Sequence, residues 1–264
     1  MVKTERELAF LRDFDITDNW TSRFTELLDK HVGFKDARSI LYMNAGTGDH
    51  CIAIREKVDA ETKMFATCEN EELLNIARDK GTAVKADVDF SEEDFDDDSF
   101  DAVIADASFT RPAAVEELVT DAVRVARKGG DVAVVLPSRG SFGEIFSLLW
   151  EVLFEEDLGE HGHVAETMIS ELPSVSRVEE MATRAGLSDV KTESTNEIFE
   201  YENGAEFVAS PLVADFLLPE WLKTLNEDEK KRVSEKLARL IDDEDGSLSF
   251  RFSVKATLLM GKKA

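Results

Sequence analysis

The middle of the chain alternates between short apolar runs and longer stretches in which apolar residues recur every three or four positions. A short apolar run is typical of a buried strand, and the longer period is typical of a helix that buries one face. The predicted strands span residues 39–43, 63–68, 83–86, 99–105 and 131–136, and the predicted helices span residues 49–57, 71–80 and 113–127. Strands that alternate with helices at this spacing form right-handed crossovers, so the pattern predicts an α/β fold with a parallel sheet.

Helical patterns dominate on both sides of this alternation. The first forty residues predict helices, with Asp18 or Asn19 as the N-cap of an amphipathic run that includes Trp20 and Phe24. Beyond residue 137 the pattern predicts helices at 142–154, 163–171 and 176–185, a strand at 189–195, a mostly helical stretch at 203–240 and a final strand at 248–258. A chain of 264 residues is in the range of one α/β domain, so a single domain is expected over residues 1–264.

Composition narrows the class of protein. The chain is 43% hydrophobic, which is enough for a sizeable core, yet it has no uninterrupted run of about eighteen apolar residues. The first residues also lack the apolar block of a secretory signal, so a soluble, cytoplasmic protein is expected. Two cysteines, Cys51 and Cys68, are too few for a disulfide framework and are expected to be thiols.

The formal net charge of −25 argues against a nucleic-acid partner. Binding to phosphates needs clustered Lys and Arg, and the sequence has no such cluster. No metal site is predicted either, because His161 and His163 have no neighbouring Cys or His that would complete one.

The turn at residues 44–48, Asn-Ala-Gly-Thr-Gly, follows the first predicted strand and precedes a helix. Glycines at such a junction let the backbone approach a ligand closely, and the amides at the helix N-terminus suit a carboxylate or phosphate. Two glycines alone are a weak signature, so a tight turn without a ligand is the alternative.

Several segments, taken in order, resemble class I (Rossmann-like) S-adenosylmethionine-dependent methyltransferases with degenerate cofactor motifs. Residues 40–48 resemble the family's V-L-D-x-G-x-G-x-G, with Asn44 at the first glycine and Tyr42 at the acid. Residues 99–105 resemble S-F-D-x-V, and residues 124–135 resemble the R-V-L-K-P-G-G segment before the fifth strand. The resemblance implies a seven-stranded, mostly parallel Rossmann-like sheet with an antiparallel last strand, helices on both faces and helical insertions.

The resemblance also implies an organisation and a cofactor. Residues 1–37 would form N-terminal helices, residues 38–136 the cofactor-binding core, and residues 137–264 the substrate-side helices and final strands. The cofactor implied is S-adenosyl-L-methionine, and a small-molecule substrate is the expected acceptor.

The cofactor residues follow from matching each motif in turn. The glycine turn contributes Asn44, Ala45, Gly46 and Gly48. Aligning residues 77–78 with the family's Ala-Arg puts Cys68 at the acid that holds the ribose, with Glu69 beside it. Residues 86–88 resemble G-D-A, which assigns Asp87 and Val88 to the adenine. Asp106, at the end of the fourth strand, would serve cofactor or substrate, or else cap the following loop and helix.

Two of these positions depart from the family. A thiol at Cys68 is a poor acceptor for two hydroxyls, and Glu69 replaces it only if the strand end twists or bulges, because adjacent strand residues face opposite sides. Tyr42 removes the acid that supports the methionine ammonium group.

Three functions therefore remain open. The first is methyl transfer to a small acceptor, and the second is a methyltransferase-like protein that binds a ligand or partner without turnover. A nicotinamide-dependent oxidoreductase is disfavoured because the third glycine of G-x-G-x-x-G is missing. The apolar segment 207–221 is expected to pack onto the main domain, with a substrate cover or a homodimer contact as alternatives.

Overall fold

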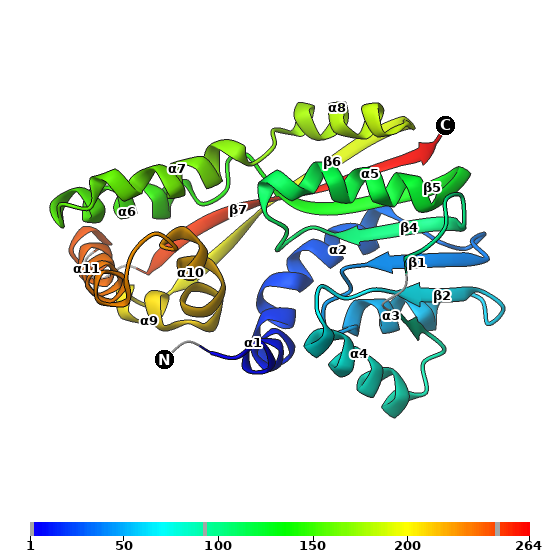
Figure 1. The fold of residues 1–264 in the computed structure, drawn as a ribbon, viewed down its shortest axis with the longest axis horizontal. Helices are drawn as coiled ribbons and strands as arrows, with labels where there is room; N and C mark the ends of the chain where they lie inside the picture. The colour runs from blue at the N-terminus through cyan, green and yellow to red at the C-terminus, as the bar shows by residue number, and fades with distance from the viewer. Residues whose placement is uncertain (1–2, 92–93, 246–248) are drawn as a thin grey trace. The chain divides into compact units, whose positions relative to one another are not determined.

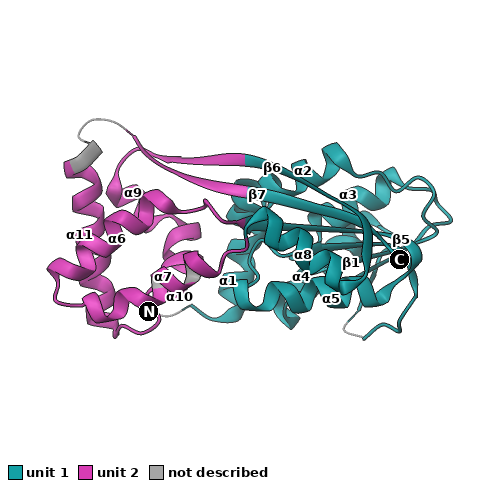
Figure 2. Ribbon diagram, turned by 90° about the horizontal axis from the view of Figure 1, so that it is seen from above, with its two compact units in different colours: residues 1–137, 174–195, 256–264 teal, residues 138–173, 196–255 magenta. Residues whose placement is uncertain are grey.

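The structure is a computed structural model that describes residues 3–91, 94–245 and 249–264 (Figure 1). Its contacts divide the chain into two compact units (Figure 2). Unit 1 comprises residues 1–137, 174–195 and 256–264, and unit 2 comprises residues 138–173 and 196–255. Whether the two units fold as the single domain expected from the sequence stays a prediction.

The N-terminal segment is helical from Glu5 to His31. It consists of α1 (Glu5–Leu11), a π-helix η1 (Arg12–Thr21) and α2 (Ser22–His31). The helix begins at a capping box, in which Thr4 Oγ1 accepts from the Glu7 amide at 3.3 Å and the Glu7 carboxylate accepts from the Thr4 amide at 2.8 Å. The predicted N-cap at Asp18 or Asn19 is therefore wrong, because both residues lie inside the helical segment.

One seven-stranded sheet organises unit 1. Its strand order is β3-β2-β1-β4-β5-β7-β6. The strands are β1 (Ser39–Met43), β2 (Lys63–Ala66), β3 (Asp89–Phe90), β4 (Phe100–Asp106), β5 (Ala126–Ser138), β6 (Leu187–Tyr201) and β7 (Phe250–Lys263). The five strands from β3 to β5 pair in parallel, which confirms the predicted parallel core.

The last strand is antiparallel, as the resemblance implied. In β6 and β7, Ser188 Oγ donates to the Lys262 carbonyl at 3.1 Å, whereas Ser194 pairs with Thr257 at 2.9 Å. Moving forward along β6 thus means moving backward along β7, and the arrows in Figure 1 show the same opposed directions. Two long strands, β6 and β7, run from unit 1 into unit 2.

Helices cover both faces of the sheet, because alternate strand residues point to opposite sides. On one face, Leu41 and Val134 pack with apolar residues of α5 (Val115–Val125) and α8 (Val175–Ala185). On the other face, Tyr42 contacts His50 of α3 (Asp49–Lys57). Helix α4 (Glu71–Val84) follows β2.

The predicted third strand at 83–86 is wrong. Helix α4 continues to Val84 and ends at Lys85, which adopts a left-handed conformation with φ +56°. Strand β3 follows only at Asp89–Phe90. Four residues that combine apolar and charged side chains fit the last turn of an amphipathic helix as well as they fit a short strand.

Unit 2 is built from helices around an aromatic cluster. Its elements are α6 (Gly143–Glu155), η3 (Gly159–His161), α7 (Gly162–Glu171), α9 (Gly204–Ala209), η4 (Leu212–Leu217), α10 (Leu218–Trp221) and α11 (Glu227–Asp245). Phe207 packs against Phe250 with a centroid distance of 4.9 Å, and Trp221 packs against Phe146 at 5.2 Å. Phe207 and Trp221 of the apolar segment 207–221 are therefore buried within unit 2, and the expectation that the segment packs onto the main domain stays a prediction. Among the residues that the structure describes, no helix has both the length and the apolar character that a membrane span requires.

Candidate functional site

The glycine turn joins β1 to α3 at the carboxyl edge of the sheet. Asn44, Gly46 and Gly48 adopt left-handed conformations, with φ angles of +57°, +58° and +85°. Asn tolerates this region better than other residues with a side chain, so it can stand where the family has its first glycine. The Ala45 amide donates to the Thr67 carbonyl at 2.7 Å, which ties the turn to the end of β2.

Glu69 brings a carboxylate onto this turn. Strand β2 ends at Ala66, so Glu69 lies in the connection to α4, where strand alternation no longer decides which way a side chain points. The next residue, Asn70, caps α4 by accepting from the Leu73 amide at 3.0 Å. Glu69 Oε2 accepts from the Gly46 amide at 3.2 Å, so the two loops that follow β1 and β2 meet at this carboxylate.

Cys68 lies elsewhere. It lines a cavity of about 330 Å³ together with Leu41, Met43 and Arg124. Burial and the neighbouring Glu69 raise the pKa of the Cys68 thiol to about 12, although Arg12 and Arg78 oppose the shift. Cys68 is therefore a neutral thiol, and the carboxylate of Glu69, not Cys68, contacts the glycine turn.

Arg12 supplies a buried cation to the same place. Its Nη2 donates to Glu69 Oε1 at 2.9 Å, and its guanidinium lies 4.2 Å from the centroid of the Phe109 ring. A Cβ added to Gly46 would come within 3.1 Å of Nη2, so the guanidinium rests against the turn. Sequence reasoning missed Arg12, because the contact joins residues 57 positions apart and no motif marks it.

Asp106 ends β4 beside the turn. Its carbonyl oxygen accepts from Asn44 Nδ2 at 3.2 Å, and its Oδ1 accepts from the Ser108 amide at 2.7 Å. The side chain is buried, and this burial raises the pKa of Asp106 to about 6, while hydrogen bonds from Ser108 act in the opposite direction. The bond to Ser108 means that Asp106 caps the start of the following loop, whereas the helices after it begin at the N-caps Arg111 and Ala114.

Tyr42 occupies the position of the family's first acid without providing a charge. Burial raises the pKa of Tyr42 well above its usual value, and nearby carboxylates add to this rise. Its hydroxyl lies 3.0 Å from His50 Nδ1, and His50 Nε2 lies 3.2 Å from Asp29 Oδ1. Burial lowers the pKa of His50, although Asp29 opposes the shift. A neutral His50 accepts from Tyr42 and donates to Asp29, so a carboxylate lies at the far end of the chain of hydrogen bonds.

Asp87 and Val88 are not brought to the turn. They precede β3, and the register pairs Asp89 with Phe65 and Phe65 with Leu41. Extending this register by two residues sets Asp87 level with the start of β1, at the edge of the sheet opposite to the turn. Its side chain is 89% exposed and its carbonyl accepts from Arg55 near the end of α3. In place of Asp87, the register brings Phe90 near the turn, and a Cβ on Gly48 would lie 3.1 Å from its ring.

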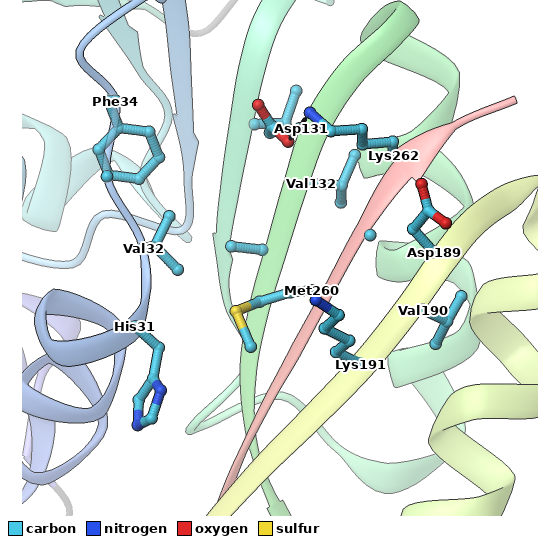
Figure 3. Close-up of a pocket in the computed structure, with 14 residues that line it drawn as sticks. His31, Val32, Phe34, Asp131, Val132, Asp189, Val190, Lys191, Met260 and Lys262 are labelled. Carbon is cyan, nitrogen blue, oxygen red and sulfur yellow. Dashed lines mark hydrogen bonds and ion pairs between the residues drawn. The ribbon is translucent and has the colours of Figure 1, made fainter.

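A second cavity in unit 1 is separate from these residues. It has a volume of about 470 Å³ and lies between the end of α2 and strands β5, β7 and β6 (Figure 3). Val132 and Met260 form part of an apolar floor, and Asp131 pairs with Lys262 at its rim at 2.5 Å. None of the residues assigned to the cofactor lines it, so it adds nothing to the site at the turn.

Comparisons with known proteins bear on the family and the fold. The model of the ubiE/COQ5 methyltransferase family matches residues 9–198. No curated protein matches the sequence at a significant level.

Many solved structures share the fold. The YcgJ protein of Bacillus subtilis matches with a TM-score of 0.59 and 16% identity over 91% of this chain and 98% of its own. Phosphoethanolamine N-methyltransferase 2 of Haemonchus contortus, in complex with phosphomonomethylethanolamine and S-adenosylhomocysteine, matches with a TM-score of 0.57 and 14% identity over 98% of this chain and 58% of its own. The methyltransferase bound to the Trm112 methyltransferase activator of Haloferax volcanii matches with a TM-score of 0.54 and 18% identity over 99% of each chain.

Proposed function

Because the chain belongs to the ubiE/COQ5 methyltransferase family, we propose that it transfers a methyl group from S-adenosylmethionine to a small-molecule acceptor. The observation that carries the proposal is the carboxylate of Glu69 at the glycine turn, 3.2 Å from the Gly46 amide. A carboxylate at the end of the second strand is what the family uses to hold the two ribose hydroxyls. Glu69 supplies it although Cys68 stands at the aligned position.

The residues at the turn fit this cofactor. Gly46 and Gly48 hold left-handed conformations that would strain a side chain, and an added Cβ would lie 3.1 Å from Arg12 Nη2 at Gly46 and 3.0 Å from the Ala77 Cβ at Gly48. Asn44 and Ala45 complete the turn, and Glu69 would accept hydrogen bonds from the ribose. The bound cofactor would supply an electrophilic methyl group on a sulfonium. The turn and Glu69 would hold it in place, which is the main contribution the protein has to make to a transfer by proximity.

Asp106 is the group proposed to act on the acceptor. It lies at the end of β4 with one carboxylate oxygen fixed by the Ser108 amide. A carboxyl with a pKa of about 6 is ionised for the most part at neutral pH, yet it remains basic enough to take a proton from an acceptor. We propose that Asp106 orients the acceptor and accepts the proton that the acceptor loses when it bonds to the methyl carbon, while the carbon–sulfur bond breaks and S-adenosylhomocysteine leaves.

A small molecule is the acceptor favoured by charge and by analogy. A net charge of −25 disfavours nucleic acid, and the Haemonchus enzyme has phosphomonomethylethanolamine bound. We also propose that the protein is cytoplasmic and forms a homodimer, and sedimentation measures its oligomeric state.

The second candidate is a protein that binds the cofactor or a partner without turnover. Tyr42 favours it, since a buried neutral phenol replaces the acid that supports the cofactor ammonium group. The Haloferax methyltransferase is bound to an activator protein, so an activator is one class of partner to consider for this chain too.

Calorimetric titration with S-adenosylmethionine, S-adenosylhomocysteine and NAD tests the cofactor assignment. Both S-adenosyl ligands should bind and NAD should not, and thermal unfolding should shift upward with the first two alone. Binding of NAD in preference to both would overturn the proposal. Methyl transfer from labelled cofactor to a panel of small acceptors separates the two candidates, because only the enzyme consumes the cofactor.

A further inference from the structure

Arg12 is the buried cation of the candidate site, and it is only 8% exposed. A buried charge needs a counter-charge or hydrogen bonds to offset its lost hydration. Among the described residues, the carboxylate that pairs with Arg12 is Glu69, through Nη2 and Oε1. Glu69 is also the carboxylate proposed to hold the ribose.

The two carboxylate oxygens of Glu69 would therefore face two sets of donors, one from the protein and one from the ribose. Arg12 uses Oε1 and the Gly46 amide uses Oε2. The two ribose hydroxyls would donate to these oxygens as well, so the ion pair between Arg12 and Glu69 would be weakened when the cofactor binds. The charge of Arg12 also lowers the pKa of Asp106, but among the described residues its ion pair is with Glu69, so a guanidinium released from Glu69 needs a second anion close to the turn.

The position of the guanidinium is fixed by its surroundings. It stacks on Phe109, and Phe109 in turn packs against Trp20 with a centroid distance of 5.4 Å. The Arg12 carbonyl accepts from Thr17 Oγ1 at 2.8 Å within the π-helix. The contact with Phe109 would hold the guanidinium over the glycine turn when its pairing with Glu69 changes.

We propose that Arg12 binds the α-carboxylate of S-adenosylmethionine, exchanging Glu69 for the carboxylate that the cofactor brings. This inference rests on the proposed function. A guanidinium offers five donors in a planar fork, so it can pair with a second carboxylate through two parallel hydrogen bonds. The N-terminal helix would thereby become part of the cofactor site, and the chain would select ligands that carry an amino-acid carboxylate.

The test compares S-adenosylmethionine with decarboxylated S-adenosylmethionine, which keeps the sulfonium and the amine. Charge-assisted hydrogen bonds contribute enough that the parent protein should bind the carboxylate ligand roughly 10- to 100-fold more tightly. In Arg12→Met, which keeps the apolar length of the side chain, this ratio should fall to about threefold or less. Arg12→Lys keeps the charge without the fork, so it should give an intermediate ratio.

Arg177→Met is the matched control, since Arg177 forms ion pairs with Glu116 and Glu180 in the same unit. It should leave the ratio as in the parent. Circular dichroism of each variant checks folding, and Arg12→Lys keeps the test informative if Arg12→Met does not fold. An unchanged ratio in both Arg12 variants, with both ligands bound, overturns the inference and leaves Arg12 as a structural partner of Glu69. If the parent binds neither ligand, the proposed function itself fails.

Discussion

Glu69 Oε2 accepts a hydrogen bond of 3.2 Å from the main-chain amide of Gly46, although the two residues follow different strands. The bond joins the loop after β1 to the loop after β2 at the carboxyl edge of a parallel sheet. Ligands of such sheets bind at this edge, where loops from neighbouring strands meet. The bond therefore brings the glycine turn and Glu69, the residue that follows Cys68 in the sequence, into one site.

Replacing Glu69 with Gln should weaken the binding of S-adenosylmethionine. The change removes the charge but keeps the size of the side chain. Loss of charge-assisted hydrogen bonds is worth about 1.5–3 kcal/mol, so the dissociation constant should rise about one to two orders of magnitude in calorimetry.

Cys68→Ser is the control for that substitution. Because Cys68 lines a different cavity from the turn, the affinity of the Cys68→Ser variant for S-adenosylmethionine should match that of the parent. If Cys68 lay at the ribose instead, Cys68→Asp would tighten binding and Glu69→Gln would have little effect. That pattern would contradict the assignment to Glu69.

Gly46→Ala should weaken cofactor binding beyond what its loss of stability would explain. The left-handed backbone strains any side chain, at a cost of about 1–2 kcal/mol for an L-residue. The added Cβ would also lie 3.1 Å from Arg12 Nη2, on the surface that the ligand needs.

Gly129→Ala is the control, because it introduces similar backbone strain at a position outside the candidate site. Gly129 has φ +75° and open space around it, so its variant should lose similar stability in urea titrations but keep its affinity. Equal affinity in both variants would mean that the ligand does not approach the turn.

Local signals explain why most of the sheet was predictable. Strand β1 and the turn follow each other in 39–48, and each has its own marker: an apolar run and glycines. The capping box at Thr4 and Glu7 is also a local signal, and the sequence interpretation passed over it in favour of Asp18 or Asn19.

Other parts of the site depend on distant residues. Lys85 ends α4 in a left-handed conformation that no local feature of a lysine indicates. Because the helix continues to Val84, the third strand begins later than predicted, and Asp87 precedes this strand instead of following it. Whether Glu69 or Cys68 reaches the turn depends on where β2 ends, which is a property of its pairing with β1. Arg12 is positioned by contacts to Glu69 and Phe109 that only the folded chain brings together.

Truncation after Asp245 should yield an insoluble protein. The cut removes β7, which lies between β5 and β6 in the sheet. Both neighbours would be left with unpaired backbone groups along their length, and exposed strand edges promote aggregation. The measurement is the soluble fraction after expression, compared with a deletion of Lys263 and Ala264 alone, which should remain soluble. A soluble, cooperatively unfolding truncated chain would show that β7 is dispensable.

Asp106→Asn should stabilise the protein, and more at pH 8 than at pH 5. Burial raises the pKa of Asp106 from 3.8 to about 6, so the folded state prefers the protonated carboxyl. The contribution of the neutral form to stability is therefore complete below about pH 4 and is lost as the pH rises through about 6. Between pH 5 and pH 8 this loss amounts to about 1 kcal/mol or somewhat more, since one pKa unit corresponds to about 1.4 kcal/mol.

An asparagine at this position carries no charge at any pH, and its carbonyl oxygen can still accept from the Ser108 amide. The difference in unfolding free energy between Asp106→Asn and the parent should thus grow in favour of the variant as the pH rises, when both are unfolded in urea at pH 5, 6, 7 and 8. Asp131→Asn gives the reference, because Asp131 is exposed and paired with Lys262 at the surface, so its variant should differ from the parent by a small and nearly constant amount. A pH-independent difference for Asp106→Asn would mean that Asp106 is ionised in the folded protein throughout this range. Its role as a proton acceptor with a pKa near neutrality would then be untenable, whatever the affinity of the site for the cofactor.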